Sequence, residues 1–197
     1  MSEILLLRHG ETEWSMAGRH TGRTDLPLTK RGRKRAKRAA TILAGREFGL
    51  VMASPLQRAR KTAKLAGLLP DEYNDDLLEW DYGGFEGLST AQIRSQLNDP
   101  NWIIWDSVVP PGATAGESPE EVAYRTKRVI ERCLPVLQAG QDCALVAHAH
   151  VLRILTATWL DLPARDGRLF YLDTGALSAL GFEHEQRVIN RWNQPPK

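Results

Sequence analysis

The stretch ILLLRHGETEW, residues 4–14, joins four consecutive apolar residues to an arginine, a histidine and a glycine. A short apolar run of this kind is typical of a buried strand, so we predict a strand over residues 4–7. Arg8 and His9 follow at once, and both side chains are costly to bury without partners. Either the strand reaches the surface there, or it delivers a cation and an imidazole into a cleft.

The overall composition is that of an ordinary soluble globular protein. The chain has 197 residues, of which 42% are hydrophobic and 25% charged, and its formal net charge is +2. We expect one domain over residues 1–197. The sequence shows neither an apolar run of the ~20 residues that span a bilayer nor a signal-peptide pattern. Cys133 and Cys143 lack the spacing of a metal site or a disulfide framework, so we expect a cytoplasmic protein with no membrane partner.

Strand and helix signals alternate along the chain. Strands are predicted over residues 4–7, 50–53, 143–147, 176–183 and 187–192, and helices over 30–46, 55–68, 119–139 and 150–160. The predicted helix starts use Thr29, Ser54 and Ser118 as N-caps, Pro55 and Pro119 at first positions, and Glu121 in a capping box. Residues 72–87 are expected to form a strand end and a loop, 88–115 a long connection, and 193–197 a frayed tail. The alternation predicts an α/β fold: a three-layer α/β/α sandwich with a mostly parallel central sheet.

Polar residues stand where the predicted strands and the acidic stretch end: Arg8 and His9, Arg58, Glu79 and His148. Ligands of such sheets bind beyond the carboxyl ends of the strands. Guanidinium groups match phosphate oxygens, and neighbouring cations favour a neutral, nucleophilic imidazole. A carboxylate beside them can act as general acid and then as general base. The set predicts phosphoryl transfer through a phosphohistidine, with no metal and no cofactor.

The same residues lie in motifs that resemble those of the histidine phosphatase superfamily, also called the phosphoglycerate-mutase-like family. In chain order the motifs are Leu7-Arg8-His9-Gly10-Glu11-Thr12, Ser54-Pro55-Leu56-Gln57-Arg58-Ala59, Glu79-Trp80-Asp81-Tyr82-Gly83 with Glu86-Gly87, Gly116-Glu117-Ser118, and Val146-Ala147-His148. The resemblance implies that His9 is the phosphorylated nucleophile, and that Glu79 protonates the leaving oxygen and then activates water. It further implies a phosphate site made of Arg8, Arg58, His148, Ser15, Thr21 and Gly22. Three positions depart from the usual pattern: Ala149 stands for glycine, Lys61 for glutamine and Ser15 for asparagine.

Within this family the sequence resembles the phosphatases more than the mutases. The mutases share an arginine-rich insertion after the third motif, whereas residues 88–115 contain a single basic residue, Arg94. Residues 14–15, 18–22 and 24–29 are similar to a branch that includes acid phosphatases and sugar-bisphosphatases. We therefore expect a hydrolase of small phosphorylated metabolites such as sugar phosphates or bisphosphates, with a phosphoglycerate mutase as the alternative. The candidates for binding the distal part of a substrate are His20, Tyr82 and Arg125.

Three further patterns each leave two interpretations open. Trp102 and Trp105 lie in a non-periodic segment and are either an aromatic lid or a satellite packing cluster. His148 and His150 could share one face of a strand, but no third ligand has metal-like spacing, so no metal site is expected. Residues 30–38 hold seven basic residues in nine. A solvated helix face is favoured there over a non-catalytic polyanion-binding domain, and no nucleic-acid partner is expected. A homodimer through an edge strand stays open.

Overall fold

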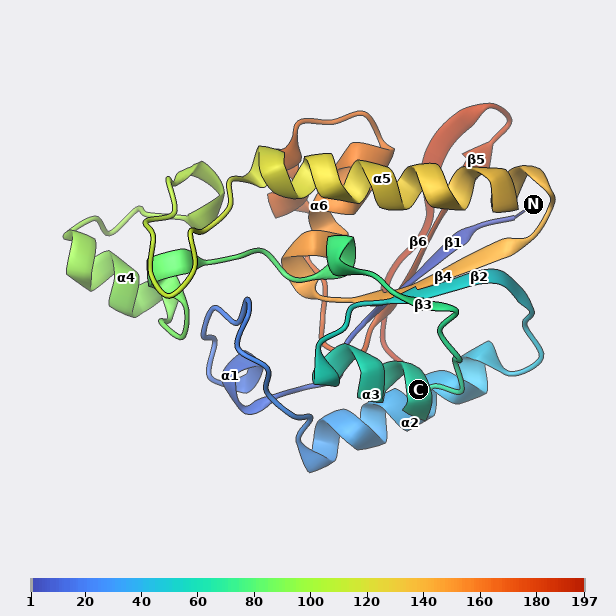
Figure 1. Ribbon diagram of the computed structural model, residues 1–197, viewed down its shortest axis with the longest axis horizontal. Coiled ribbons are helices and arrows are strands. Elements are labelled where there is room, and N and C mark those ends of the chain that lie inside the picture. Colours follow the sequence, from blue (N-terminus) through green and yellow to red (C-terminus); the bar gives the residue numbers. More distant parts are fainter. Residues whose placement is uncertain (1, 197) are drawn as a thin grey trace.

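The computed structural model describes residues 2–196, and a six-stranded sheet forms its centre (Figure 1). The strands are β1 (Ile4–Arg8), β2 (Phe48–Ala53), β3 (Glu72–Tyr73), β4 (Asp142–Ala147), β5 (Leu177–Glu183) and β6 (Gln186–Gln194). They lie in the order β3-β2-β4-β1-β5-β6. The first four are parallel to one another, and β5 and β6 form an antiparallel pair at one edge.

Helices cover both faces of the sheet (Figure 1). On one face lie α5 (Pro119–Gln138) and α6 (Ala149–Trp159), and on the other α2 (Lys30–Leu43) and α3 (Gln57–Leu65). The predicted three-layer sandwich with a mostly parallel sheet is thereby confirmed. None of the helices within residues 2–196 is long and apolar enough to cross a membrane.

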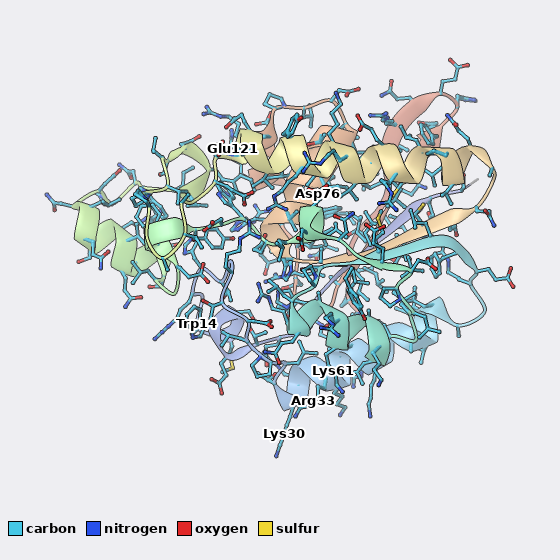
Figure 2. The ribbon with its side chains drawn as sticks, in the orientation of Figure 1. Trp14, Lys30, Arg33, Lys61, Asp76 and Glu121 are labelled. Carbon is cyan, nitrogen blue, oxygen red and sulfur yellow. The ribbon has the colours of Figure 1, made fainter. Side chains whose placement is uncertain are left out.

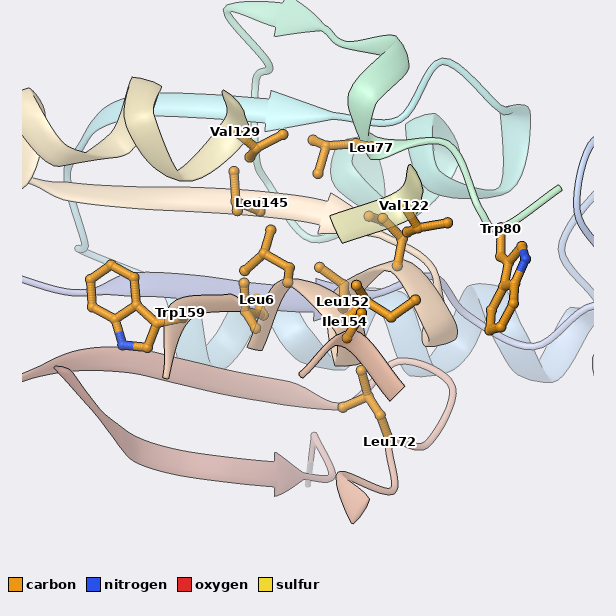
Figure 3. Packing of buried hydrophobic residues seen from close by; sticks show 14 of the residues in the cluster. Leu6, Leu77, Trp80, Val122, Val129, Leu145, Leu152, Ile154, Trp159 and Leu172 are labelled. Carbon is orange, nitrogen blue, oxygen red and sulfur yellow. The ribbon is translucent and has the colours of Figure 1, made fainter. Parts of the chain in front are cut away.

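Successive side chains along a strand point to opposite faces of the sheet. Each buried strand therefore contributes side chains to two apolar clusters, one on each face. Ile4 and Leu6 of β1 belong to a core cluster with α5 and α6, whereas Leu5 and Leu7 belong to a cluster with α2 and α3. Figure 3 shows Leu6 and Leu145 of the sheet packed with side chains from the α5 and α6 layer. Continuous apolar strands such as residues 4–7 are expected for a sheet that is buried on both faces.

The helix caps follow the sequence in two cases and differ in one. Ser118 and Glu121 form the predicted capping box at the start of α5, and the Thr29 hydroxyl accepts a hydrogen bond at the start of α2. The predicted cap of α3 is wrong, because α3 begins at Gln57 and its N-cap is Leu56, which makes no side-chain cap. Ser54 instead lies 2.7 Å from a ring nitrogen of His148.

Two short helices and four 3₁₀ turns were not expected from the sequence. They are α1 (Glu13–Met16), α4 (Thr90–Leu97) and the turns Asp75–Leu77, Gly83–Phe85, Ile104–Asp106 and Ala164–Leu169. The predicted frayed tail is also wrong in part, because β6 extends to Gln194 and Asn193 bonds Asp173 and Ser178. Lys197, at the end of that predicted tail, lies outside the described residues.

The basic run of residues 30–38 forms the outer side of α2. Ala36 and Ala39 are buried and Ala40 is half-buried, while the lysines and arginines are exposed or half-exposed. In Figure 2, Lys30, Arg33 and Lys61 gather at the outer side of α2 and α3, whereas Asp76 and Glu121 lie on the side of α5. This arrangement agrees with a solvated helix face.

Two glycines let the turn after β1 pack directly on the start of α2. A Cβ at Gly10 would lie 2.5 Å from the carbonyl oxygen of Gly32, and a Cβ at Gly32 would lie 2.2 Å from that of Glu11. The Thr29 hydroxyl donates to the Glu11 carboxylate at 2.8 Å, and the Thr29 amide donates to the Glu11 carbonyl at 2.9 Å. Because His9 precedes this turn, the close approach of the two backbones helps to hold His9 in place.

Gly32→Ala is expected to lower the free energy of unfolding by about 1–3 kcal/mol, the range typical of overpacked sites. The loss should exceed the gain of about 1 kcal/mol that alanine has over glycine inside a helix, because the new Cβ meets backbone atoms. Urea denaturation measures the difference. Lys37→Ala, on the exposed side of the same helix, is the control and should stay within about 0.5 kcal/mol. A Gly32→Ala protein as stable as the unmodified one would contradict the tight contact.

Candidate active site

A cleft of about 430 Å³ contains many of the predicted site residues. It is lined by Arg8, His9, Ser15, Gly18, Arg19, His20, Thr21, Glu79, Tyr82, Thr90, Ala149, His150 and Tyr171. Arg8 and His9 come from the carboxyl end of β1, and Ala149 and His150 follow the carboxyl end of β4. The surfacing-strand interpretation of residues 8 and 9 is therefore wrong, and the cleft interpretation holds.

His9 is held as a neutral imidazole. Its backbone amide donates to Ala147 O at 2.9 Å, and its Nδ1 lies 2.7 Å from Gly10 O. A carbonyl oxygen only accepts, so Nδ1 carries the proton and Nε2 keeps its lone pair. Burial, together with the charges of Arg58 and Arg8, lowers the pKa of His9 well below the ordinary value for histidine. These conditions leave Nε2 of His9 with the free lone pair that a nucleophile requires.

Arg58 and His148 lie fully buried behind His9 and do not line the cleft. Arg58 Nε donates to His148 Nδ1 at 3.0 Å, and its terminal nitrogens donate to the carbonyls of Thr21, Gly22 and Thr24. Because Nδ1 of His148 accepts, its Nε2 carries the proton and donates to Ser54 Oγ at 2.7 Å. Both ring nitrogens of His148 thus have protein partners, and its ring meets that of His9 edge to face at 5.0 Å.

Arg8 has a hydrogen-bonding group without a protein partner. Its Nη1 donates to Leu172 O, whereas Nε is buried and has no acceptor within residues 2–196. A buried N–H without an acceptor is unfavourable by about 1–3 kcal/mol. Arg8 also lines the cleft beside His9, so its guanidinium adds positive charge there.

Glu79 is buried, and the start of α6 fixes its carboxylate. Trp80 N and Val151 N donate to Oε1 at 3.0 and 2.8 Å, and His150 N donates to Oε2 at 3.1 Å. The amides at the first turn of a helix are natural partners of a carboxylate. Oε2 accepts a single N–H and keeps a second position for a proton. Glu79 is thereby placed in the same cleft as His9 with a site for proton transfer.

The three smaller residues of the predicted phosphate site differ in their positions. Ser15 and Thr21 line the cleft, and Ser15 also completes the cap of α1 with Thr12. Gly22 does not line it, because its amide donates to both carboxylate oxygens of Glu86 at 3.0 and 2.9 Å. Gly22 instead contributes its carbonyl, which accepts from Arg58 at 2.8 Å. Gly22, which the resemblance placed in the phosphate site, therefore lies outside the cleft lining, and its amide is already engaged by Glu86.

Arg125, a candidate for the distal part of the substrate, requires a correction. It does not line the cleft, and all three of its nitrogens donate to protein acceptors. These acceptors are the carboxylate of Glu117 and the carbonyls of Asp76, Leu78 and Glu79. Through these bonds Arg125, a residue of α5, holds the backbone of residues 76–79 and so helps to position Glu79. The other two candidates, His20 and Tyr82, do line the cleft.

The lid interpretation of Trp102 and Trp105 is wrong. Both are 6% exposed and belong to the same cluster as the α5 and α6 side of the core, so they form neither a lid nor a satellite cluster. Trp105 packs edge to face on His150 at 4.9 Å, and Trp102 on His20 at 6.0 Å. The tryptophans form the wall behind two cleft histidines.

Several cleft residues were not predicted. Arg19 lies within a quoted motif, so its position in the sequence gave a signal that was not used. Thr90 and Tyr171 come from segments without a motif, and the sequence pattern suggested His150 only as a partner of His148 in a metal site. His148 is the N-cap of α6 and His150 lies in its first turn, so the two do not share a strand face. Within residues 2–196, no three His, Cys, Asp or Glu side chains are grouped so as to hold a metal ion.

Four histidines around the cleft, His9, His20, His148 and His150, make stability depend on pH. Burial lowers the pKa of each of them below the ordinary value of 6.5. Below pH 6.5 the unfolded chain therefore binds more protons than the folded one. The free energy of unfolding should fall as the pH falls, by up to about 1.4 kcal/mol per pH unit for each histidine. Urea denaturation at pH 7.5, 6.5 and 5.5 measures it, and equal stability at all three would contradict the neutral state of these rings.

Comparison with known proteins agrees with this geometry. The family model described as histidine phosphatase superfamily (branch 1) matches residues 4–195. An acid phosphatase of Mycobacterium tuberculosis is 41% identical over 188 residues, covering 94% of this chain and 89% of the relative. Sedoheptulose 1,7-bisphosphatase of Saccharomyces cerevisiae is 33% identical over 186 residues, covering 80% of this chain and 67% of the relative. A phosphoglycerate mutase of Xanthobacter autotrophicus that depends on 2,3-bisphosphoglycerate is 34% identical over 185 residues, covering 88% of each chain.

A solved structure matches over the whole length as well. The product of an open reading frame of Mycobacterium tuberculosis superposes with a TM-score of 0.91 at 38% identity. The superposition covers 100% of this chain and 99% of that one.

Proposed function

Because the chain belongs to the histidine phosphatase superfamily, branch 1, and is an enzyme that hydrolyses phosphomonoesters, we propose that it works through a phosphohistidine on His9. The observation that carries this proposal is the state of His9. Its Nδ1 is bonded to the Gly10 carbonyl, which leaves Nε2 without a proton, its pKa is lowered by burial and by two arginines, and His9 lines the same cleft as Glu79.

The reaction has two steps in this proposal. His9 Nε2 attacks phosphorus, an N–P bond forms, the ester P–O bond breaks, and Glu79 in its acid form gives a proton to the leaving oxygen. Glu79, now a carboxylate, then takes a proton from water, which attacks phosphorus and breaks the N–P bond. Inorganic phosphate and unmodified His9 result, and Glu79 is again an acid.

In this proposal one charged group near His9 contacts the phosphate directly, and the others act on it from behind His9. Arg8 lines the cleft beside His9, so its guanidinium is the candidate for direct contact. Arg58 supplies positive charge behind the nucleophile, and His148 orients it through their 3.0 Å hydrogen bond. Such fixed charge stabilises the transferred phosphoryl group without a metal ion.

The substrates in this proposal are small phosphorylated metabolites such as sugar phosphates and bisphosphates. The acid phosphatase and the sugar bisphosphatase among the relatives support this class. The two free cysteines, both buried, agree with a reducing compartment, and we place the enzyme in the cytoplasm. A mutase activity is the second candidate, because one relative of similar identity is a phosphoglycerate mutase.

A panel of phosphomonoesters in buffer with EDTA tests the proposal. Sugar mono- and bisphosphates, phosphoglycerates and p-nitrophenyl phosphate are incubated with the enzyme, and inorganic phosphate is measured. Release that survives EDTA supports metal-independent hydrolysis. Conversion of 3-phosphoglycerate to its isomer without release of phosphate, after priming with a bisphosphate, would identify a mutase instead. Loss of all activity in EDTA, restored by a divalent metal, would reject the mechanism.

A further inference from the structure

The proposed reaction leaves two cleft histidines without a role, His20 and His150. Both line the cleft, and their rings stack with centroids 6.5 Å apart at an interplanar angle of 21°. Neither Nε2 atom has a protein partner within residues 2–196, and neither is among the buried polar atoms that lack one. Both atoms are therefore open to whatever occupies the cleft.

The proton of His20 lies on Nδ1. This atom is 2.9 Å from the carbonyl oxygen of Leu88, which can only accept a hydrogen bond. Nε2 of His20 therefore keeps its lone pair and presents an acceptor to the cleft. Burial lowers the pKa of His20, so the ring stays neutral near pH 7.

The proton of His150 lies on the other nitrogen. Its Nδ1 is hydrogen-bonded to the hydroxyl of Tyr82, a side chain that is 2% exposed. Burial raises the pKa of Tyr82 well above its usual value, so the hydroxyl keeps its proton. Within residues 2–196 its one hydrogen-bond partner is Nδ1 of His150, and a buried O–H without an acceptor is unfavourable. Tyr82 therefore donates to Nδ1, and Nε2 of His150 presents an N–H donor to the cleft. The ring is also neutral, because burial lowers the pKa of His150 well below its usual value.

The surroundings hold the two rings in this arrangement. Trp105 and Trp80 pack edge to face on His150 at 4.9 and 5.8 Å, and Trp102 packs on His20 at 6.0 Å. This wall presents no guanidinium to the cleft, because Arg125 donates elsewhere and Arg153, whose guanidinium lies 4.7 Å from the ring centre of Trp105, does not line the cleft. A hydroxyl group, by contrast, both donates and accepts, and so matches a neighbouring acceptor and donor.

We propose that His20 and His150 form a hydroxyl-recognition subsite, which makes phosphomonoesters of polyols, such as sugar monophosphates, the favoured substrates. The assignment rests on the proposed hydrolase function and selects among its substrates. The competing anchor is Arg19, an exposed cleft residue whose guanidinium lies 5.8 Å from the ring centre of Trp14. A second phosphate bound there would favour bisphosphates.

The test compares two substrates that differ in hydroxyl groups, ribose 5-phosphate and phenyl phosphate. For His20→Leu and His150→Leu, kcat/KM for ribose 5-phosphate should fall about 10- to 100-fold more than kcat/KM for phenyl phosphate, the loss expected for one or two hydrogen bonds. His20→Gln and His150→Gln keep a polar group near the position of Nε2 and should recover part of the difference. His184→Asn, in the exposed β5–β6 turn where φ is 52°, is the matched control and should leave the ratio unchanged.

Each other outcome has a distinct meaning. Equal losses on both substrates would overturn the hydroxyl subsite while leaving the hydrolase intact. A preference of tenfold or more for fructose 1,6-bisphosphate over fructose 6-phosphate that disappears in Arg19→Ala would overturn it in favour of a second phosphate site. No phosphate release from either ester by the unmodified enzyme would reject the proposed function itself. Circular dichroism and thermal melting of each variant separate these results from unfolding.

Discussion

His9→Ala is expected to lower kcat for phosphate release by about 10⁴-fold or more, the loss seen when a catalytic nucleophile is removed from a group that acts as a unit. The physical reason is that no other imidazole around the cleft has the surroundings of His9. His148 has both ring nitrogens bonded, and Tyr82 donates to Nδ1 of His150, so that its Nε2 carries the proton. His20 keeps a lone pair on Nε2 but lacks the charges of Arg8 and Arg58 that act on His9. Initial rates with p-nitrophenyl phosphate and a sugar phosphate measure the effect.

The matched control for His9→Ala is again His184→Asn, which removes an exposed imidazole in the β5–β6 turn. Its rate of phosphate release should stay within about twofold of that of the unmodified enzyme, because surface substitutions commonly have small effects. Quenching in alkaline denaturant during turnover should trap a phosphoenzyme that is stable in alkali and labile in acid in the control, and none in His9→Ala. A His9→Ala enzyme that is folded and retains a tenth of the activity would exclude His9 as the nucleophile.

Glu79→Gln is expected to lower kcat for a sugar phosphate by about 10²- to 10⁴-fold, the contribution typical of general acid–base catalysis. Glutamine has nearly the shape of glutamate but carries no transferable proton. Its amide oxygen can still accept from Trp80 N and Val151 N, while its NH₂ group would face the His150 amide, so one of three hydrogen bonds is lost. Steady-state kinetics and thermal melting together separate the catalytic loss from the structural one.

The leaving group sharpens the test of Glu79. p-Nitrophenolate leaves without help from an acid, so formation of the phosphoenzyme from p-nitrophenyl phosphate should slow much less than formation from a sugar phosphate. A burst of p-nitrophenol followed by slow turnover would show that hydrolysis of the phosphoenzyme has become limiting. Glu13→Gln, an exposed carboxylate on α1 close to His9 in the sequence, is the control and should change neither substrate. Equal losses on both substrates without a burst would contradict proton transfer by Glu79.

The fold was largely predictable because its strands and long helices carry strong local signals. Apolar runs such as residues 4–7 and 143–147 are typical of buried strands and were predicted as such. Ser118 with Glu121 defines the start of α5 within a few residues. The elements that were missed lack such signals. Only one residue of α4, Ile93, is buried, so the helix has no apolar stripe that the sequence could display. The lid interpretation of Trp102 and Trp105 was wrong because segments distant in the sequence bury these two residues. Burial of this kind produces no periodic pattern of apolar residues in the sequence.

Site residues were predictable where the residue itself lines the cleft at the end of a strand or motif. They were less predictable where the role depends on hydrogen bonds to residues distant in the sequence. His9 and Glu79 line the cleft as expected. The role of Arg125 depends on backbone carbonyls of residues 76–79, which lie nearly fifty positions earlier in the sequence. Every residue has a backbone carbonyl, so the residue types at these positions do not reveal the contact. The protonation pattern of His20 and His150 likewise depends on Leu88 and Tyr82, which only the tertiary structure brings to those rings.

The place of β1 in the sheet has a consequence for how the protein is made. β1 pairs with residues 143–147 on one side and residues 177–180 on the other. A ribosome releases the chain from its amino end, so the apolar strand that leads to His9 emerges well before both of its neighbours are synthesised. During that interval it is a candidate for chaperone binding. A nascent chain stalled before residue 142 would already contain Arg8, His9, Arg58 and Glu79, yet it would lack both strands that hold the nucleophile in place.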